Sequence, residues 1–176
     1  MKKYELTEET KVIDGKTLFR IRALRSFGDI KAGDLGGFIE NERNLSHEGN
    51  AWVGGDAQVG GNARVGGNAW VGDNAQVGGN AQVGGDAWVD GDAWVDGDGL
   101  INSNNDYLCE KGLGSHNRSA SFFKCKDGHI HVLCGCFSGN LDEFENKVKE
   151  EHGNSKYAKE YLGFIEVVKT HFEVRQ

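Results

Sequence analysis

The sequence predicts a mainly β protein, in which a parallel β-helix lies between an N-terminal β-hairpin cap and a small C-terminal α+β domain. Residues 49–102 repeat a six-residue unit nine times without insertion, and this period is typical of a solenoid of about three to four coils. Residues 12–21 alternate around an Asp-Gly turn, which predicts the hairpin. Two amphipathic helical patterns near the C-terminus predict the α+β domain.

These patterns divide the chain into four segments. We expect an N-terminal β cap over residues 1–36 and the solenoid over residues 37–102. The polar run Ser-Asn-Asn-Asp at 103–106 is expected to be a linker, and residues 107–176 form the C-terminal domain.

Each unit of the repeat predicts one short strand and one turn. In Gly49-Asn50-Ala51-Trp52-Val53-Gly54, the Ala and Val are two residues apart and therefore point to the same side of a strand, inward. The Gly-Asn and Gly-Asp pairs supply turns, because both residue types tolerate positive φ. Three strands per coil make a triangular prism with strands stacked about 4.8 Å apart. Ile39 and Leu45 fall in phase with the Ala positions, which predicts weaker units upstream.

The run Val53-Gly54-Gly55-Asp56-Ala57-Gln58 resembles the hexapeptide-repeat family, whose pattern is aliphatic, small, any, any, small, any. The resemblance implies a left-handed parallel β-helix, and it implies assembly into homotrimers. The C-terminal run from Gly112 to Arg118 and the lead-in from Gly33 to Ile39 are similar to phage and prophage proteins. This second resemblance implies a phage origin.

The residue between Ala and Val points outward, and residues 18 apart stack on one face. One face therefore carries Trp52, Trp70 and Trp88, while Trp94 stacks with glutamines on the next. Because soluble monomers seldom expose such an aromatic stripe, we expect this face to be an oligomer interface. Recognition of another macromolecule and stabilisation of the coil by stacking are the alternatives.

Charge is uneven along the chain, whose net charge is −7. Residues 49–102 hold one Arg against seven Asp, and five of these carboxylates crowd the C-terminal end of the repeat: Asp86, Asp90, Asp92, Asp96 and Asp98. Solvated turns, a calcium site and mimicry of nucleic-acid phosphates can each account for the cluster. The same charge argues against direct DNA binding by the prism. We predict that these carboxylates face a partner.

Other features bear on location. No apolar run is long enough for a membrane span, and the start lacks a signal-peptide core. We therefore expect a cytoplasmic protein, in the cytoplasm of a host cell, with reduced cysteines.

In the C-terminal domain we expect strands at 107–110, 119–125 and 129–134 and helices at about 141–151 and 155–173. Asn140 with Glu143 forms a capping-box pattern, and Gly153 ends the first helix. The loop from Gly112 to Ser119 is the best candidate ligand site, since its glycines let amides approach an anion. We predict a ligand set of Ser115, His116, Asn117, Arg118 and His152.

Cysteine and histidine spacing leads us to expect no metal and no cofactor. Cys134 and Cys136 share a strand face, and zinc could join them to Cys109, Cys125, His129 and His131. The spacing matches no standard zinc pattern, however, and buried free cysteines are common in small cores.

The predicted function is that of a non-enzymatic phage protein, an oligomer that blocks a nucleic-acid-handling or signalling component of bacterial defence. A sponge for a nucleotide signal and a structural or virion-associated spacer are alternatives. Acyl transfer, the reaction of many hexapeptide enzymes, is disfavoured because residues 49–102 contain no His to act as a base.

Overall fold

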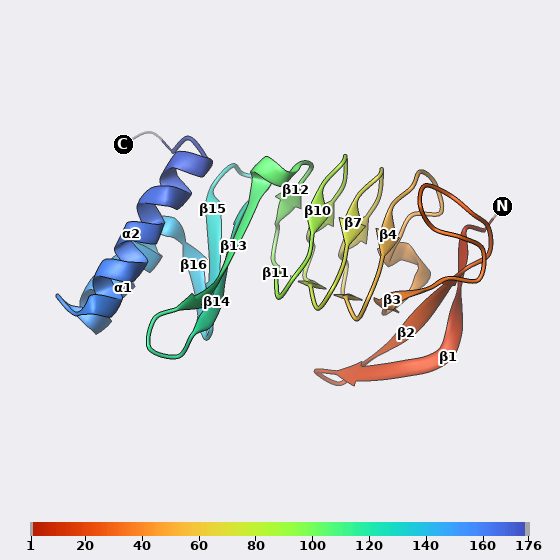
Figure 1. Cartoon of the computed structure of the whole chain (residues 1–176), viewed down its shortest axis with the longest axis horizontal. Coiled ribbons are helices and arrows are strands. Elements are labelled where there is room, and N and C mark those ends of the chain that lie inside the picture. Colours follow the sequence, from red (N-terminus) through yellow and green to blue (C-terminus); the bar gives the residue numbers. More distant parts are fainter. Residues whose placement is uncertain (1, 175–176) are drawn as a thin grey trace.

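The computed structural model describes residues 2–174 and shows a parallel β-solenoid with a hairpin at one end and a sheet with two helices at the other (Figure 1). The fold class is confirmed. Strands 18 residues apart pair in parallel, as Val53 does with Val71, and this sorts the repeat into three faces. We name them the Trp face, the Gln face and the Arg face. The Trp face holds β4 (Trp52–Val53), β7 (Trp70–Val71) and β10 (Trp88–Val89). The Gln face holds β5 (Gln58–Val59), β8 (Gln76–Val77) and β11 (Trp94–Val95), and the Arg face holds β6 (Arg64–Val65), β9 (Gln82–Val83) and β12 (Leu100–Ile101).

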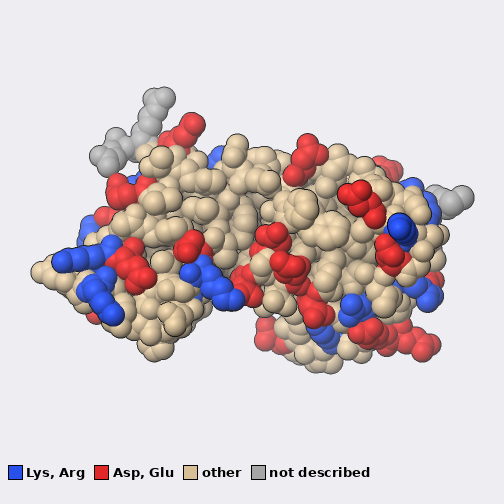
Figure 2. Space-filling view, in the orientation of Figure 1, with Lys and Arg blue, Asp and Glu red and all other residues tan. Residues whose placement is uncertain are grey.

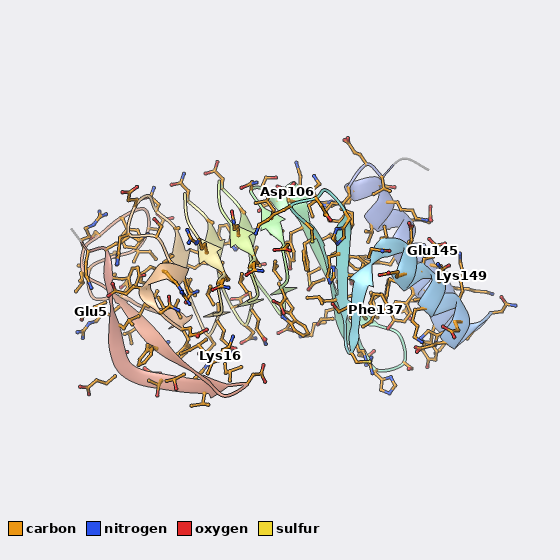
Figure 3. The ribbon with its side chains drawn as sticks, turned by 180° about the vertical axis from the view of Figure 1, so that it is seen from behind. Glu5, Lys16, Asp106, Phe137, Glu145 and Lys149 are labelled. Atoms are coloured by element: carbon orange, nitrogen blue, oxygen red, sulfur yellow. The ribbon has the colours of Figure 1, made fainter. Side chains whose placement is uncertain are left out.

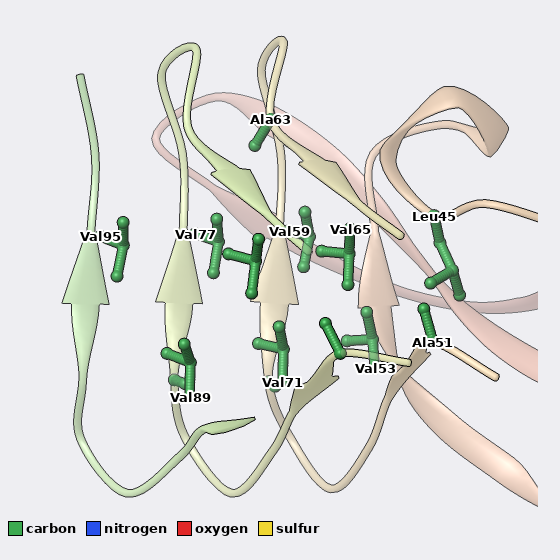
Figure 4. Close-up of a cluster of buried hydrophobic side chains, with 14 of the residues drawn as sticks. Leu45, Ala51, Val53, Val59, Ala63, Val65, Val71, Val77, Val89 and Val95 are labelled. Carbon is green, nitrogen blue, oxygen red and sulfur yellow. The ribbon is translucent and has the colours of Figure 1, made fainter. Parts of the chain in front are cut away.

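The inward Ala and Val side chains form the solenoid core. Every Ala and Val from Ala51 to Val95 is at most 2% exposed, and the valines stack in columns along the coil axis (Figure 4). Backbone bonds join successive coils, for example from the Gly54 N–H to the Val71 carbonyl at 2.8 Å. The single unit buries little, so the stacking of coils supplies the stability.

The first coil differs from the prediction in its register. Ile39, at the end of β3 (Leu35–Ile39), pairs with Val59, and Leu45 forms a bridge with Val65. The predicted weaker units upstream are therefore present, but Ile39 and Leu45 lie in the Val columns although they are in phase with the Ala positions in the sequence. Their larger side chains suit a Val position, and two additional residues between Leu45 and Val53 absorb the shift. A short 3-10 helix, Glu42–Asn44, turns the chain at this end.

The predicted N-terminal hairpin is present as β1 (Tyr4–Ile13) and β2 (Lys16–Ala23). Asp14 and Gly15 both have positive φ, of 49° and 75°, which is the geometry of a two-residue hairpin turn. β2 also pairs with β3, so the hairpin extends the Gln face into one six-stranded sheet. Buried Tyr4, Ile21 and Phe27 join the solenoid core and close its N-terminal end.

The C-terminal unit is an antiparallel sheet in the order β13-β14-β15-β16 with two helices on one side. Its strands are β13 (Tyr107–Leu113), β14 (Arg118–Lys124), β15 (Ile130–Cys134) and β16 (Phe137–Asn140), and its helices are α1 (Leu141–His152) and α2 (Lys156–His171). The three expected strands and both helices are present, and β16 is an addition. The capping box is also confirmed, since Asn140 accepts a bond from the Glu143 N–H at 2.9 Å and Glu143 accepts from the Asn140 N–H.

The sheet lies between two cores. Phe122 and Val132 face the helices, whereas Phe123, Cys125 and Leu133 belong to the core cluster of the solenoid. The sheet therefore covers the C-terminal end of the solenoid, as the hairpin covers the other.

The segment expected as a linker is folded. It contains a 3-10 helix, Asn104–Asp106, whose Asp106 carboxylate lies at the junction and pairs with Lys124 at 2.9 Å (Figure 3). Asn104 also accepts a hydrogen bond from the Trp88 N–H at 2.7 Å. These contacts hold the segment against both the solenoid and the sheet.

Candidate functional site

The Trp face presents two tryptophans to solvent instead of three. Trp52 is only 1% exposed, because the N-terminal segment covers it. The rings of Tyr4 and Phe27 meet it edge-on, with centroids 6.5 Å and 5.5 Å away. The expectation that Trp52 belongs to an exposed stripe is therefore wrong, since the cap packs on the first coil from the side as well as over its end.

Trp70 and Trp88 form an exposed aromatic pair. Their ring centroids are 5.8 Å apart with a tilt of 40°, and Trp88 is 55% exposed. Trp70 is half-buried and lies over Gly54, where an added Cβ would be 2.7 Å from its ring. The absence of a side chain at Gly54 thus leaves room for the Trp70 ring. Trp94, on the Gln face, is 41% exposed.

A groove of about 520 Å³ runs beside Trp88, where the solenoid meets the C-terminal sheet. Trp88, Tyr107, Leu108 and Cys109 form its apolar part. Its polar lining comes from Asp90, Asp92, Asn104, Lys111, Ser119 and His171. A site of this kind suits an apolar or cationic side chain of a partner.

The acidic cluster has a structural explanation in part. Asn68, Asn74 and Asn80 each donate a side-chain hydrogen bond to the carboxylate one coil further on. The acceptors are Asp86, Asp92 and Asp98, at 3.0, 3.3 and 3.4 Å respectively. A carboxylate only accepts, so Asp suits the last rung of such a ladder. The signal was present in the sequence, as an Asn 18 residues before each Asp.

Two of these carboxylates also hold the C-terminal unit. Asp92 pairs with Lys111, and Asp98 pairs with Lys126 at 3.5 Å. The hydrogen bonds from Lys111 and from Asn74 hold the pKa of Asp92 below its usual range. Within residues 2–174, Asp86, Asp90 and Asp96 have no ion pair. In the view of Figure 2, acidic side chains form a row over the middle of the molecule, and basic ones gather mainly toward the two ends.

The predicted loop lines a pocket of about 470 Å³ at the start of α2. Gly112, Gly114, Ser115 and Asn117 contribute to it. Three further residues that the sequence did not suggest complete the lining: Lys156, Tyr157 and Glu160. The Gly114 N–H donates to the Glu160 carboxylate at 3.3 Å, so an internal anion already uses this amide.

The rest of the predicted ligand set does not converge on this pocket. His116 contacts Ser115, with its Nδ1 2.9 Å from the hydroxyl. The Arg118 guanidinium lies over Gly135 in the β15–β16 turn. His152 stacks on Tyr161 with centroids 5.7 Å apart, and neither Arg118 nor His152 lines the pocket. Of the five predicted residues, Ser115 and Asn117 form part of it.

The cysteines are spread over the C-terminal unit, while one group of potential metal ligands comes together. Cys134 is buried toward the helices, Cys136 is exposed, and Cys109 lines the groove. Cys125, His129 and His131, by contrast, bring one ligand atom each to within 4.8 Å of the others. This convergence depends on the turn between β14 and β15, which spacing alone did not reveal.

Comparisons with known proteins leave the family open. A scan against protein-family models finds no matching family. A search of curated proteins finds no similar sequence. In residues 2–174, neither helix combines the length and the apolar character that a membrane crossing requires.

Proposed function

We propose that the protein is a non-enzymatic binding protein that self-associates through its Trp face and presents acidic turns to a basic partner. The observation that carries this proposal is the aromatic pair Trp70–Trp88, of which Trp88 is 55% exposed. Gln occupies the equivalent outward position at Gln76 and Gln82, so the coil itself does not need an indole there. Exposed Trp of this kind is typical of binding hot spots.

A second copy of the chain is the occupant we propose for this face. The face is built from short parallel strands in register, and the coils run without an interrupting loop. Two such faces can approach closely and bury both indoles. The homotrimer that hexapeptide proteins commonly form is the assembly we favour, with the left-handed coil of that family.

The oligomer is tested by comparing two tryptophans on neighbouring faces. We expect light scattering after gel filtration to give a multiple of the 19.2 kDa chain mass for the unmodified protein. Trp88→Glu should give the monomer mass, whereas Trp94→Glu, the same change on the Gln face, should leave the oligomer intact. A monomeric unmodified protein, or an oligomer that survives Trp88→Glu, contradicts the proposal.

The partner we propose is a basic, nucleic-acid-handling component of host defence, which the protein blocks. Asp86, Asp90 and Asp96 support this, because within residues 2–174 they have no ion pair to neutralise them. An oligomer repeats these carboxylates and raises avidity for a basic groove. The alternative of a nucleotide sponge has less support, because the Gly114 N–H of the predicted loop already donates its hydrogen bond to Glu160.

Affinity capture from a host lysate tests this part. We expect a nucleic-acid-handling component to be captured, with a loss of capture as salt increases. The variant with Asp86→Asn, Asp90→Asn and Asp96→Asn should no longer capture this component. A control variant with Glu150→Gln and Glu151→Gln on α1 should still capture it. Equal capture by both variants, or capture that is insensitive to salt, contradicts an acidic interface.

A further inference from the structure

The turn between β14 and β15 brings together three side chains of the types that bind zinc. Cys125 follows β14, and His129 and His131 lie two residues apart at the start of β15. The turn is fixed by the bond from the Cys125 N–H to the His129 carbonyl at 2.9 Å, and by Gly128 at a φ of 89°. We propose that Cys125, His129 and His131 form a Zn²⁺ site, with a fourth position open to water.

The distance between the two imidazoles matches a shared metal. His129 Nε2 and His131 Nδ1 are 3.4 Å apart. Two nitrogens bound to one tetrahedral zinc at about 2.0–2.1 Å from the metal lie about 3.3–3.4 Å from each other. Cys125 Sγ lies within 4.8 Å of one ring nitrogen of each histidine, so an inward movement of the thiol completes the set.

The outer hydrogen bonds direct the free nitrogens toward the same point. His129 Nδ1 lies 2.5 Å from the Asp127 carboxylate, which can only accept, so this nitrogen carries the proton and Nε2 has a free lone pair. His131 Nε2 lies 2.9 Å from the Ser138 hydroxyl, which can accept its proton and leave Nδ1 free. Metal-bound histidines commonly have such a carboxylate or hydroxyl behind them. With both lone pairs free, the two nitrogens repel each other unless a cation or a shared proton lies between them.

The donor types of the site select for zinc. Zinc binds cysteine as the thiolate, so it has to displace the proton of the Cys125 thiol, and binding should strengthen as pH rises. A thiolate with two imidazoles selects zinc over magnesium or calcium, which prefer oxygen ligands.

A pocket adjoins the two histidines of the site. His129 and His131 line a pocket of about 650 Å³ together with Asn140, Asp142 and Glu143 near the start of α1. Three protein ligands with one accessible position are the arrangement of zinc sites that keep a bound water. Cys125 does not line this pocket and belongs to the core between the sheet and the solenoid.

Metal binding is tested on the full chain without an affinity tag, after removal of metal with a chelator. We expect one Zn²⁺ per chain by elemental analysis after gel filtration. We also expect Co²⁺ to produce the visible bands of a tetrahedral site together with a thiolate charge-transfer band. His129→Ala should weaken Zn²⁺ binding by at least about 10-fold. Cys125→Ser should abolish the charge-transfer band.

Two matched variants serve as controls. His116→Ala and Cys136→Ser remove the same residue types at exposed positions outside the cluster and should bind like the unmodified chain. Circular dichroism verifies that each variant is folded. Asp127→Asn, at an exposed position, is a milder change than His129→Ala or Cys125→Ser. The proposal is overturned if the unmodified chain binds no stoichiometric Zn²⁺, or if folded His129→Ala and Cys125→Ser bind it as tightly as the controls do.

Discussion

At the scale of single residues, polar side chains at the corners of the solenoid form ladders that link the coils. Asn50 donates to Asn68 at 3.2 Å, and Asn68 in turn donates to Asp86 at 3.0 Å. A second ladder runs from Asn62 through Asn80 to Asp98. Asn can both accept and donate, so it suits the middle rungs, whereas Asp can only end a ladder. The acidic end of the repeat thus follows partly from hydrogen-bond direction.

Replacing a middle rung should weaken the solenoid more than replacing an outward Gln. Asn68→Ala removes two side-chain hydrogen bonds, and we expect it to lower the free energy of unfolding by about 1 kcal/mol. Gln82→Ala, at an exposed position on the Arg face, should change it by less than about 0.5 kcal/mol. Urea denaturation measures both values, and equal effects would show that the ladder adds no stability.

A buried lysine gives the N-terminal cap a dependence on pH. Lys3 is fully buried, and its Nζ donates to the Ala51 carbonyl at 2.7 Å. Burial, followed by the charge of Arg25, lowers the pKa of Lys3 from 10.5 to about 8. Between these two values the unfolded chain keeps the proton and the folded chain has released it. Stability from this group therefore rises with pH across the window and is lost as pH falls toward 8.

Lys3→Met should remove this dependence. Between pH 8 and 9.5 we expect the unmodified protein to gain stability relative to the variant, by at most about 1.4 kcal/mol per pH unit. The comparison stays below pH 10 because burial also raises the pKa of neighbouring Tyr4, which acts in the opposite direction at higher pH. Thermal melts at several pH values measure the difference, and parallel curves for the two proteins would contradict it.

At the scale of elements, β3 lies unusually close to the coil below it. A Cβ at Gly37 would lie 2.5 Å from the Ala57 carbonyl oxygen and 2.8 Å from a Val53 methyl carbon. Gly163, in the middle of α2, has open space where a Cβ would stand. Glycine is therefore required at position 37, where it permits a close backbone approach. At position 163 no contact requires a glycine.

The same substitution should therefore have opposite effects at these two positions. Gly37→Ala should destabilise the protein by about 1–3 kcal/mol, because the coil has to shift to admit a methyl group. Gly163→Ala should stabilise it by about 0.5–1 kcal/mol, since alanine favours the helix. Denaturant titrations measure both changes. Destabilisation by Gly163→Ala would contradict the open space, and a neutral Gly37→Ala would contradict the close approach.

The elements also show where sequence patterns are sufficient and where they are not. The six-residue period predicts the solenoid, because each Ala and Val repeats its environment in the next coil. The capping box of α1 is equally local, since Asn140 and Glu143 lie three residues apart. The burial of Trp52 depends instead on Tyr4 and Phe27, which are distant in sequence and carry no periodic signal.

The candidate sites follow the same rule. The glycines of the sequence predict the ligand loop. They do not predict that Lys156 and Glu160 of α2 line the same pocket. Cys125, His129 and His131 converge only because the hairpin turn has a defined register. Local spacing identifies the residue types, whereas packing and strand register decide which of these residues meet.

At the scale of the whole molecule, the two halves of the chain share one core. Phe123 is fully buried in the solenoid cluster although it belongs to β14, and the Ser121 hydroxyl on the same strand accepts a bond from the Trp94 N–H at 2.9 Å. Such a junction should make the solenoid and the C-terminal unit unfold together, since neither can open without exposing the core of the other.

This coupling can be measured with two probes that report on different halves. All four tryptophans lie in the solenoid, and both α-helices lie in the C-terminal unit. We expect tryptophan fluorescence and helical circular dichroism to show the same thermal midpoint in the unmodified protein. Phe123→Ala should lower the free energy of unfolding by about 3–5 kcal/mol. It should also separate the two midpoints, because it weakens the junction. Phe144→Ala removes a buried ring from the core between sheet and helices and should lower both midpoints together. Separate midpoints in the unmodified protein would show that the two halves unfold independently. A joint shift in Phe123→Ala would show that their coupling does not depend on Phe123, and either result contradicts the prediction.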